Sequence, residues 1–438
     1  MLDIKFIREN QKAIKKAAKN KHIDLNLDKL LEIDEQRVKY IQKINDLQAQ
    51  KNQLNEEIQK AQDKKTTIAK GKEIKEKLTE LESQYKKIKK QFDELMVKVP
   101  NPVAPDTPTG RDENDNVEIE KWGEIPKFDF EPKNYLQLAE DLDIVDTKRG
   151  AKVGGYRGYY LKNEGMHLVM ALMMYALDKM AQKGFKPMIP PTLVKGFALF
   201  GSGYFQGLEY DGAIDEIYQV ATSDKEADGT ASKEKKFLVG TAEPSLLAYH
   251  SGETVKEEDL PLKMCGFSQC YRSEIGSYGR DTKGFYRVHE FMKVEQVVLC
   301  RADIEESVKL QDEMVAISKE MHKELGLSHR LLRMCTGEMS AGKYRFFDIE
   351  IWLPATKKWA ETCSASNFLD WQARRLNVKY AGVDGKKKFV FMLNNTALSS
   401  LRPLIGILEN FQQADGSVVI PEVLRKWMPG GMSVIKKK

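Results

Sequence analysis

Two heptad runs constrain the fold of the amino-terminal part more strongly than any other sequence feature. In each run, seam residues follow one another at alternating steps of four and three, as in helices that pack along one stripe. The runs are Ile33, Arg37, Tyr40, Ile44, Leu47, Lys51, Leu54, Ile58, Ala61 and Ile74, Leu78, Leu81, Tyr85, Ile88, Phe92, Leu95, Val99. The short segment 62–71 can turn the chain back. We therefore predict an antiparallel helical arm over about residues 28–99, roughly 50 Å long at ~1.5 Å per residue.

The predicted arm is basic, above all at its tip. The lysines that crowd the tip are Lys60, Lys64, Lys65, Lys70 and Lys72. A protruding basic arm can follow a phosphate backbone and recognise the shape of an RNA. Two other interpretations stay open at this point: a structural or dimerising coiled coil, and lysines that are solvated i,i+4 partners of glutamates.

A proline-rich segment separates the arm from the rest of the chain. Residues 100–116, PNPVAPDTPTGRDENDN, hold four prolines before a polar acidic run and cannot continue a helix. We predict a helical arm with its linker over 1–110 and a second domain over 111–438, which is long enough for a large core. Ahead of the arm, residues 1–23 are predicted to form one short helix.

Composition limits which partners and which cellular compartment we expect for the protein. The net charge of +5 permits a polyanionic partner without requiring one. None of the five cysteines forms a CxxC pair, which favours a reducing compartment. The longest apolar segment, Met166–Leu177, is shorter than the ~20 residues of a membrane span, and Met1–Asn20 lacks the apolar run of a secretory signal. We expect a soluble, cytosolic protein with no membrane partner.

One predicted hairpin brings charged and aromatic side chains together. Its two strands flank a glycine-rich turn, with Arg272 and Glu274 on the way in and Arg287, Phe291 and Glu295 on the way back. Alternate residues of a strand share a face, so these groups are expected to converge on one surface. A guanidinium, a ring and a carboxylate suit the phosphate, base and exocyclic amine of a nucleotide. Taken singly, the same residues also fit surface ion pairs and a core ring.

The hairpin sequence YRSEIGSYGRDTKGFYRVHEFMKVE, residues 271–295, closely resembles the second signature motif of class II aminoacyl-tRNA synthetases, in the version of seryl-tRNA synthetases. The resemblance extends through the arm, the linker, three motifs and the carboxy end. It implies an α+β fold, in which an antiparallel helical arm precedes a catalytic domain built on a mostly antiparallel β-sheet flanked by helices. In this family the arm grips the long variable arm of tRNA(Ser), so the resemblance favours RNA binding.

The first family motif is matched by a helix that is apolar almost all round and by the strand after it. These are residues 165–183 and the run GFKPMIPPTLV, with Pro191 at the position of the motif's proline. Such a helix must be covered on both sides. The resemblance implies a homodimer interface here, and an ordinary buried helix is the alternative.

The third motif is matched by a strand over 389–393 and a predicted helix over 394–413, which presents Arg402 to the nucleotide. Bacterial members have a Gly-x-Gly-like lead into this arginine, whereas this chain has the run Ser399–Leu401 there. Eukaryotic members also lack these glycines and carry Thr where bacterial members have Ser, as Thr396 does here. The resemblance is therefore closer to eukaryotic-type members.

The resemblance also implies the serine-binding residues. Thr241 and Glu243, in the run FLVGTAE predicted as a strand with a polar end, match the loop that receives the serine ammonium group. Glu295 and Thr396 match the residues that take the serine hydroxyl. Arg272 matches the arginine that contacts the substrate carboxylate and the α-phosphate of ATP.

For ATP, the resemblance implies contacts from several segments. Glu274 is implied to accept from the adenine amine, with Phe291 and Arg402 on the two faces of the base. Glu361 and Ser364 are implied to hold ATP through Mg²⁺. Arg272 also belongs to the nucleotide site, and the resemblance implies that Arg272 and Arg402 are the catalytic residues. The remaining nucleotide positions are Ser273, Arg287, Val288, Thr362 and Cys363.

The predicted activity is that of a serine–tRNA ligase, which joins serine to ATP as seryl-adenylate and transfers serine to the 3′ end of tRNA(Ser). Whether tRNA(Sec) is a second substrate stays open. Two alternatives remain: a paralogue that charges a protein carrier, and a non-catalytic coiled-coil interaction protein. The basic arm disfavours the first alternative, and the intact set of charged site residues disfavours the second.

Overall fold

The computed structural model describes residues 1–60, 64–221, 223, 225, 228–230, 232, 234–275 and 284–437, without the side chains of 57–60 and 64–68. The chain forms two compact units, Leu2–Pro100 and Asn101–Lys438, called here the arm unit and the body. Among the helices so described, none combines the length and the apolarity of a membrane span.

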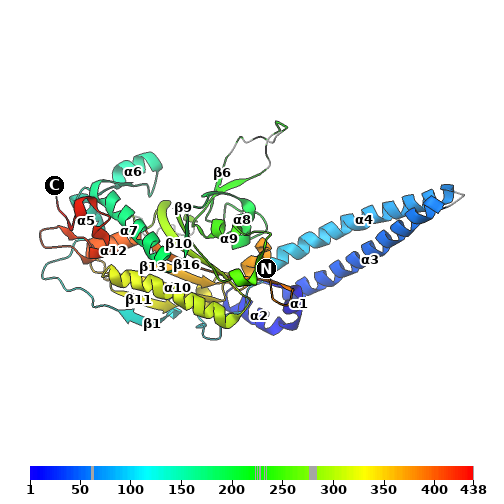
Figure 1. The fold of residues 1–438 in the computed structure, drawn as a ribbon, viewed down its shortest axis with the longest axis horizontal. Coiled ribbons are helices and arrows are strands. Elements are labelled where there is room, and N and C mark those ends of the chain that lie inside the picture. Colours follow the sequence, from blue (N-terminus) through cyan, green and yellow to red (C-terminus); the bar gives the residue numbers. More distant parts are fainter. Residues whose placement is uncertain are drawn as a thin grey trace. The chain divides into compact units, whose positions relative to one another are not determined.

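The arm unit is dominated by two long antiparallel helices, α3 (Leu27–Lys60) and α4 (Lys64–Met96) (Figure 1). The predicted turn over 62–71 is too long, because α4 already begins at Lys64. Lysine and alanine are good helix formers, and the single Gly71 costs a helix only about 1 kcal/mol.

The predicted single helix over 1–23 is wrong, since two helices form there, α1 (Ile4–Glu9) and α2 (Gln11–Asn20). They meet at Asn10, whose side chain donates to the Phe6 carbonyl. Such a bond competes with the helical ladder and favours a break.

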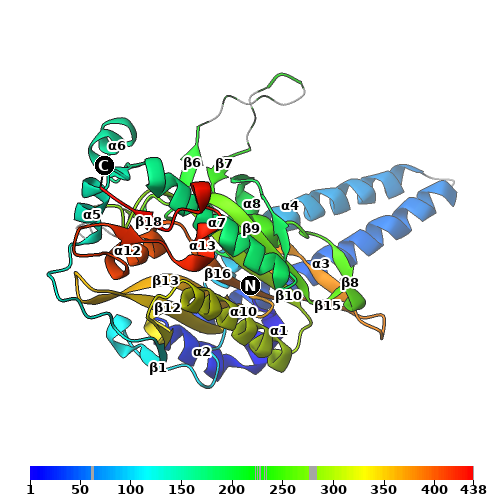
Figure 2. The same ribbon diagram turned by 60° about the vertical axis from the view of Figure 1, so that its left-hand side comes forward.

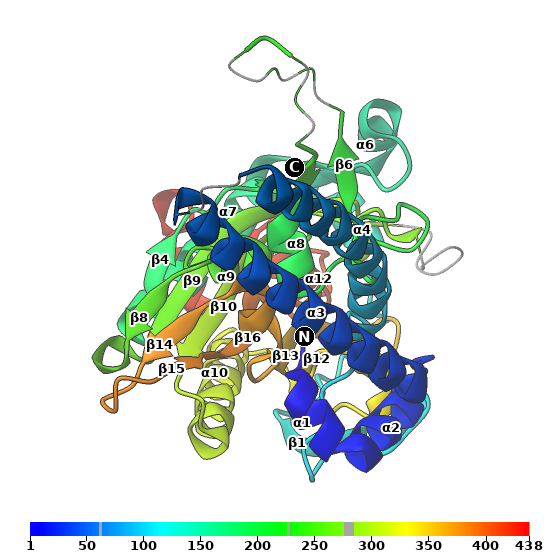
Figure 3. The same ribbon diagram turned by 90° about the vertical axis from the view of Figure 1, so that its right-hand side faces the viewer.

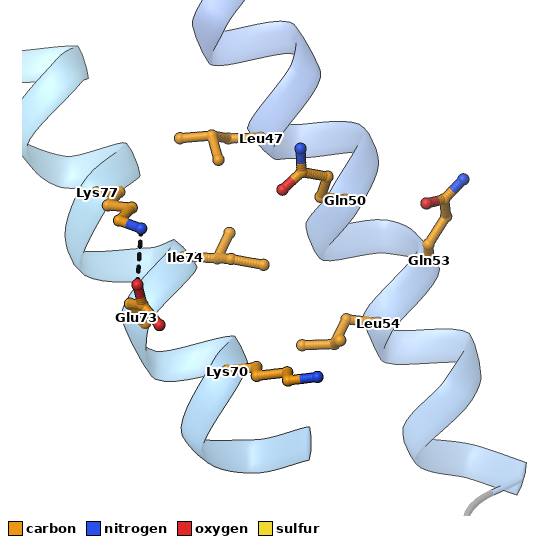
Figure 4. Close-up of a pocket in the computed structure, with 8 residues that line it drawn as sticks. All are labelled: Leu47, Gln50, Gln53, Leu54, Lys70, Glu73, Ile74 and Lys77. Carbon is orange, nitrogen blue, oxygen red and sulfur yellow. Dashed lines mark hydrogen bonds and ion pairs between the residues drawn. The ribbon is translucent and has the colours of Figure 1, made fainter. Parts of the chain in front are cut away.

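The heptad seam of the arm is unevenly packed. Ile33 and Leu78 are buried, and the polar seam residue Arg37 is accommodated because its guanidinium lies 4.6 Å from the centre of the Phe92 ring. Most other seam residues are only half-buried, since two helices alone cannot cover the stripe. Further along, the helices leave a hollow of about 420 Å³ between them (Figure 4), lined by Leu47, Gln50, Gln53, Leu54, Lys70, Glu73, Ile74 and Lys77.

The body is built on an eight-stranded sheet with the order β1-β11-β12-β13-β16-β10-β9-β4 (Figure 3). Every described pair in it is antiparallel except β4 with β9, which confirms the predicted fold class. The strands are β1 (Val117–Trp122), β4 (Lys186–Met188), β9 (Leu262–Tyr271), β10 (Glu290–Cys300), β11 (His329–Arg333), β12 (Arg345–Leu353), β13 (Lys358–Asn367) and β16 (Phe391–Ser399).

The two faces of this sheet differ in chemistry. Three helices, α7 (Asn163–Gln182), α10 (Ile304–Glu324) and α12 (Leu401–Asn410), pack on one face (Figure 2). The side chains beneath them, such as Val294 and Leu398, belong to the main apolar core. Side chains alternate along strands, so the polar residues between these core positions point to the opposite face, which carries the candidate site.

Shorter elements complete the body. The helices are α5 (Tyr135–Asp141), α6 (Thr147–Gly154), α8 (Gly196–Ser202), α9 (Glu243–Ala248), α11 (Trp371–Leu376) and α13 (Glu422–Arg425). The small sheets join β2 (Val145–Asp146) with β3 (Tyr160–Leu161), β17 (Val418–Val419) with β18 (Val434–Ile435), β5 (Leu193–Lys195) and β6 (Tyr218–Val220) with β7 (Lys236–Leu238), and β8 (Thr254–Lys256) and β15 (Lys387–Phe389) with β14 (Lys379–Ala381).

Two predicted element boundaries are wrong. The segment 394–399 continues strand β16 instead of starting a helix, because β10 pairs along its length and β13 pairs with Asn394 and Asn395 on the other side. Glu243 is the first residue of α9, not the end of a strand, and Pro244 after it stands in the first turn, where proline needs no hydrogen bond.

The central hairpin also differs from its prediction at the base. Strand β9 ends at Tyr271 and β10 begins at Glu290, so Arg272, Glu274 and Arg287 lie outside the strands. Glu274 has a φ of +55°, which no strand residue adopts.

Candidate active site

A β-bulge determines which residues of β13 reach the polar face of the sheet. In a regular strand, Glu361 and Ser364 would point to opposite faces, because they are three residues apart. The structure pairs Glu361 with Glu350 and Ser364 with Asp348, so β13 holds one residue more than β12 over this stretch. Since Asp348 and Glu350 share a face, their partners share it too. The bulge thus brings Glu361 and Ser364 together.

A second register shift builds a small polar pocket between β10 and β16. It places Glu295 directly opposite Thr396. The Thr396 hydroxyl donates to Glu295 Oε2 across 3.4 Å. Lys293, on the same face of β10, places its Nζ 2.6 Å from the same carboxylate oxygen. All three side chains are buried.

Glu243 enters the same pocket from α9 and is surrounded by neutral donors. Its Oε1 accepts from Gln372 Nε2 at 2.8 Å and from Asn394 Nδ2 at 2.9 Å, while its Oε2 accepts from the Tyr204 hydroxyl at 3.2 Å. Burial, and then the nearby charge of Glu295, raise the pKa of Glu243 to about 7. A bound cation would favour the ionised form of this carboxyl.

Two buried hydroxyl groups near these residues lack hydrogen-bond partners within the described part of the chain. They are Thr241 Oγ1, two residues before Glu243, and Ser273 Oγ, directly after Arg272. Buried polar groups are normally satisfied, so these two hydroxyls are suited to meet a ligand.

Arginine, aromatic and carboxylate groups gather at the base of the central hairpin. The Arg272 guanidinium lies 5.4 Å from the centre of the Phe291 ring. Arg287 Nη1 donates to Glu274 Oε2 at 2.8 Å, and Arg157 Nη1 lies 4.0 Å from the same oxygen. Glu274 holds a left-handed conformation, a strain that clusters at functional sites.

Arg402, in the first turn of α12, connects this group with β13. Its Nη1 donates to the Glu361 carbonyl at 2.7 Å and lies 3.2 Å from Glu361 Oε2, and its guanidinium lies 4.8 Å from the centre of the Tyr286 ring. Burial acts to raise the pKa of Glu361, but the charges of Arg402 and Arg272 outweigh it and lower that pKa.

The oxygen groups on β12 and β13 fit a hard divalent cation. Asp348, Glu350, Glu361 and Ser364 share one face, and burial followed by the charge of Glu361 raises the pKa of Asp348. A cation would relieve this repulsion. In the described residues, no group of three His, Cys, Asp or Glu side chains is placed to hold a metal alone. A cation here would therefore share oxygens with a bound phosphate.

Several predicted site residues are not brought to the polar face. The Thr362 hydroxyl donates to a backbone carbonyl and lies 2.8 Å from His322 Nε2, while the side chains of Cys363 and Val288 are buried in apolar clusters. On the arm, Lys70 and Lys72 are exposed. The side chains of Lys60, Lys64 and Lys65 lie outside the described residues.

Four pocket residues were missed from the sequence. Two of them carried a local signal, because Lys293 stands two residues before Glu295, and Asn394 two before Thr396, on strands that alternate. Gln372 and Tyr204 carried no such signal, since they come from α11 and from the loop after α8.

Comparisons with known proteins agree with this geometry. The family model described as the seryl-tRNA synthetase N-terminal domain matches residues 1–103, and that of the tRNA synthetase class II core domain (G, H, P, S and T) matches 224–411. A serine–tRNA ligase of Treponema denticola is 41% identical over 429 residues, which cover 97% of this chain and 98% of that protein.

Solved structures show the same similarity. Seryl-tRNA synthetase from Pyrococcus horikoshii, complexed with ATP, superposes with a TM-score of 0.86 at 35% identity and covers 100% of both chains. Cytoplasmic serine–tRNA ligase from Naegleria fowleri, in complex with AMP, superposes with a TM-score of 0.84 at 30% identity and covers 100% of this chain and 99% of that one.

The predicted lean towards eukaryotic-type members stays a prediction, because these identities do not test it. The resemblance seen in the motifs is nevertheless confirmed over the full length. The chain therefore belongs to the seryl-tRNA synthetase family of class II aminoacyl-tRNA synthetases.

Proposed function

We propose that this chain charges tRNA(Ser) with serine in two steps that use ATP, and that the polar face of the central sheet performs the chemistry. In the first step, a serine carboxylate oxygen attacks the α-phosphorus of ATP, which gives seryl-adenylate and releases pyrophosphate. In the second step, a hydroxyl at the tRNA 3′ end attacks the seryl carbonyl and releases AMP. The observation that carries this proposal is the convergence of one arginine–aromatic group with two buried carboxylates.

The pocket around Glu243 and Glu295 would bind serine. Glu243 and the Thr241 hydroxyl receive the ammonium group. Glu295 accepts a hydrogen bond from the serine hydroxyl, and Thr396 donates to the same oxygen. Alanine has no hydroxyl to bind these two groups, and sites built around a hydroxyl reject an analogue that lacks it by ~10⁴ or more.

The groups at the hairpin base would bind ATP. Arg272 stabilises the negative charge that builds on the α-phosphate and orients the serine carboxylate. Glu274 accepts from the adenine amine, with Phe291 against one face of the base and Arg402 against the other. Ser273 and Arg287 complete the contacts. Since no side chain acts as a nucleophile, positioning and charge stabilisation supply most of the rate.

Glu361 and Ser364 would hold Mg²⁺ together with the phosphates of ATP. Their shared face and the repulsion between Glu361 and Asp348 support this proposal. When bound, the cation would neutralise phosphate charge.

The arm would bind the tRNA. Lys70 and Lys72 are exposed on α4, and exposed lysines can neutralise phosphates at any sequence. We propose that Lys60, Lys64 and Lys65 contribute in the same way.

Two copies of the chain would associate through α7. Along this apolar helix, Met166, Met170 and Met174 recur every four residues and stay 41%, 37% and 39% exposed. Ile189, just after β4, is 84% exposed. An apolar stripe of this kind marks a protein interface, and sedimentation velocity would report the predicted homodimer.

Serine-dependent exchange of pyrophosphate into ATP, followed by charging of total tRNA, tests the proposal. We expect exchange with serine and not with alanine, and incorporation of serine into tRNA. Exchange without charging of tRNA would point to a carrier-charging paralogue. Absence of both activities would point to a non-catalytic protein.

A further inference from the structure

The serine pocket contains a buried lysine that the roles assigned above do not use. Lys293 stands two residues before Glu295 on β10, so both side chains leave the same face of the strand. Its Nζ lies 2.6 Å from Glu295 Oε2, and the two side chains are only 7% and 3% exposed. Lysine is almost never this buried without a partner.

The lysine contacts both groups of the proposed hydroxyl site. Besides its ion pair with Glu295, its Nζ lies 3.4 Å from Thr396 Oγ1. Thr396 Oγ1 in turn lies 3.4 Å from Glu295 Oε2. The three side chains form a closed triangle, so the lysine can fix the positions of the other two.

The pocket also presents a problem of charge. It holds two carboxylates, Glu243 and Glu295, for a substrate that carries one ammonium group. Serine could then bind in two orientations, with its ammonium group on either carboxylate. The two carboxylates nevertheless have different surroundings. Glu243 accepts from the neutral donors Tyr204, Gln372 and Asn394, whereas Glu295 has a full cation beside it.

We infer that Lys293 is a positioning residue that sets substrate specificity. By compensating the charge of Glu295, it directs the serine ammonium group to Glu243 and keeps Glu295 as the acceptor for the serine hydroxyl. Lys293 acts through Glu295 and does not itself react. This inference rests on the serine-binding function proposed above and names the element that selects serine.

The test compares five variants with the wild-type protein in pyrophosphate exchange with serine and with alanine. Lys293→Met removes the cation, and Lys293→Arg keeps it. Lys293→Met combined with Glu295→Gln removes both charges, with Glu295→Gln as its reference. Lys263→Met is the control, because Lys263 stands on β9 of the same sheet and forms an ion pair of the same 2.6 Å length with Glu313 of α10, outside the pocket.

We expect Lys293→Met to lower kcat/KM for serine by roughly 10²-fold and the preference for serine over alanine by about tenfold, as for a buried charge left unpaired. The KM for ATP should stay within about twofold, since the contacts of Lys293 with the described residues, Glu295 and Thr396, lie on the serine side of the site. In the Glu295→Gln background, loss of the lysine should change kcat/KM by less than about threefold, because the charge that it compensates is gone. Lys293→Arg should keep the preference, and Lys263→Met should keep both values.

An unchanged serine preference in Lys293→Met, or an equal loss in the Glu295→Gln background, would overturn the inference. If Lys293→Met fails to fold, the preference of Lys293→Arg and of the folded double variant decides the question. Loss of serine preference in Lys293→Arg, or a double variant far weaker than Glu295→Gln, would then overturn it. A wild-type protein without serine-dependent exchange would refute the proposed function itself, which is a separate outcome.

Discussion

The arm and the body of this protein place their charged side chains in opposite environments, exposed on the arm and buried in the body. On the arm, lysines such as Lys70 and Lys72 are exposed, where salt screens each charge. An exposed pair such as Lys77 with Glu73, at 2.7 Å, adds little stability. In the body, the pair of Lys293 with Glu295 is almost fully buried, and breaking a buried pair leaves an uncompensated charge. A polyanion can be bound by exposed, mobile charged side chains whose contributions add up. Chemistry on a small substrate requires charged side chains that are held in fixed positions.

The two regions also differ in how their residues meet. The seam of the arm joins neighbouring turns of two consecutive helices. The serine pocket joins Tyr204, Glu243, Glu295, Gln372 and Asn394, which come from five segments far apart in the sequence. The comparison predicts that single changes in the body will have large effects on activation, and that single changes on the arm will have small effects on RNA binding.

The largest expected effect is that of Glu295→Ala in the body. Serine-dependent pyrophosphate exchange should fall by roughly 10⁴-fold, because the serine hydroxyl loses its buried acceptor. ATP binding and tRNA binding, measured by calorimetry and filter retention, should persist. Glu290→Ala is the control, since this carboxylate stands on the same strand and is exposed. Unchanged pyrophosphate exchange in Glu295→Ala would contradict the proposed role of Glu295 as the acceptor for the serine hydroxyl.

The next effect in size is that of deleting the arm. Replacing residues 28–99 by a short glycine–serine linker should lower kcat/KM for tRNA charging by roughly 10³-fold, as expected when several phosphate contacts are lost. Pyrophosphate exchange should stay within about twofold, because the site residues all belong to the body. Retention of full charging activity would show that the arm is not the RNA-binding element.

A smaller effect concerns pH. The pKa of Glu243 is raised to about 7, and only the ionised carboxylate pairs with the serine ammonium group. Lowering the pH from 8 to 6 protonates this carboxyl in the empty pocket, so the KM for serine should rise about tenfold. Initial rates of exchange across this range would measure the slope. The Glu243→Gln variant, which cannot titrate at this position, should bind serine weakly at every pH, and a slope that persists in it would assign the titration elsewhere.

The smallest effects are expected from single arm lysines. Lys70→Ala and Lys72→Ala should each raise the KM for tRNA about threefold and reduce the salt slope by about one, as for the loss of one phosphate contact. Lys77→Ala is the matched control, because Lys77 is already paired with Glu73 and should matter less. A 100-fold rise in the KM for tRNA on substitution of any single lysine would show that the arm recognises tRNA through one specific contact.

Much of the fold was predictable because its signals are local. The heptad period predicted the helix pair α3 and α4, and the four prolines after Val99 predicted its end. Where prediction failed, tertiary pairing prevailed over local pattern. The run from Asn394 to Ser399 becomes a strand because β10 pairs along its length and β13 pairs with its first two residues.

The sequence by itself determined the arm, the linker and the family motifs in their order, since periodicity and motif spacing act along the chain. The motifs also named most of the site residues, but only the tertiary structure decided how their side chains meet and which further residues join them. One extra residue in β13 turns Glu361 and Ser364 to the same face, and the register of β10 against β16 places Thr396 opposite Glu295 beside Lys293. The physical reason is that a bulge and a register depend on the neighbouring strand, and a one-residue shift sends a side chain to the other face of the sheet.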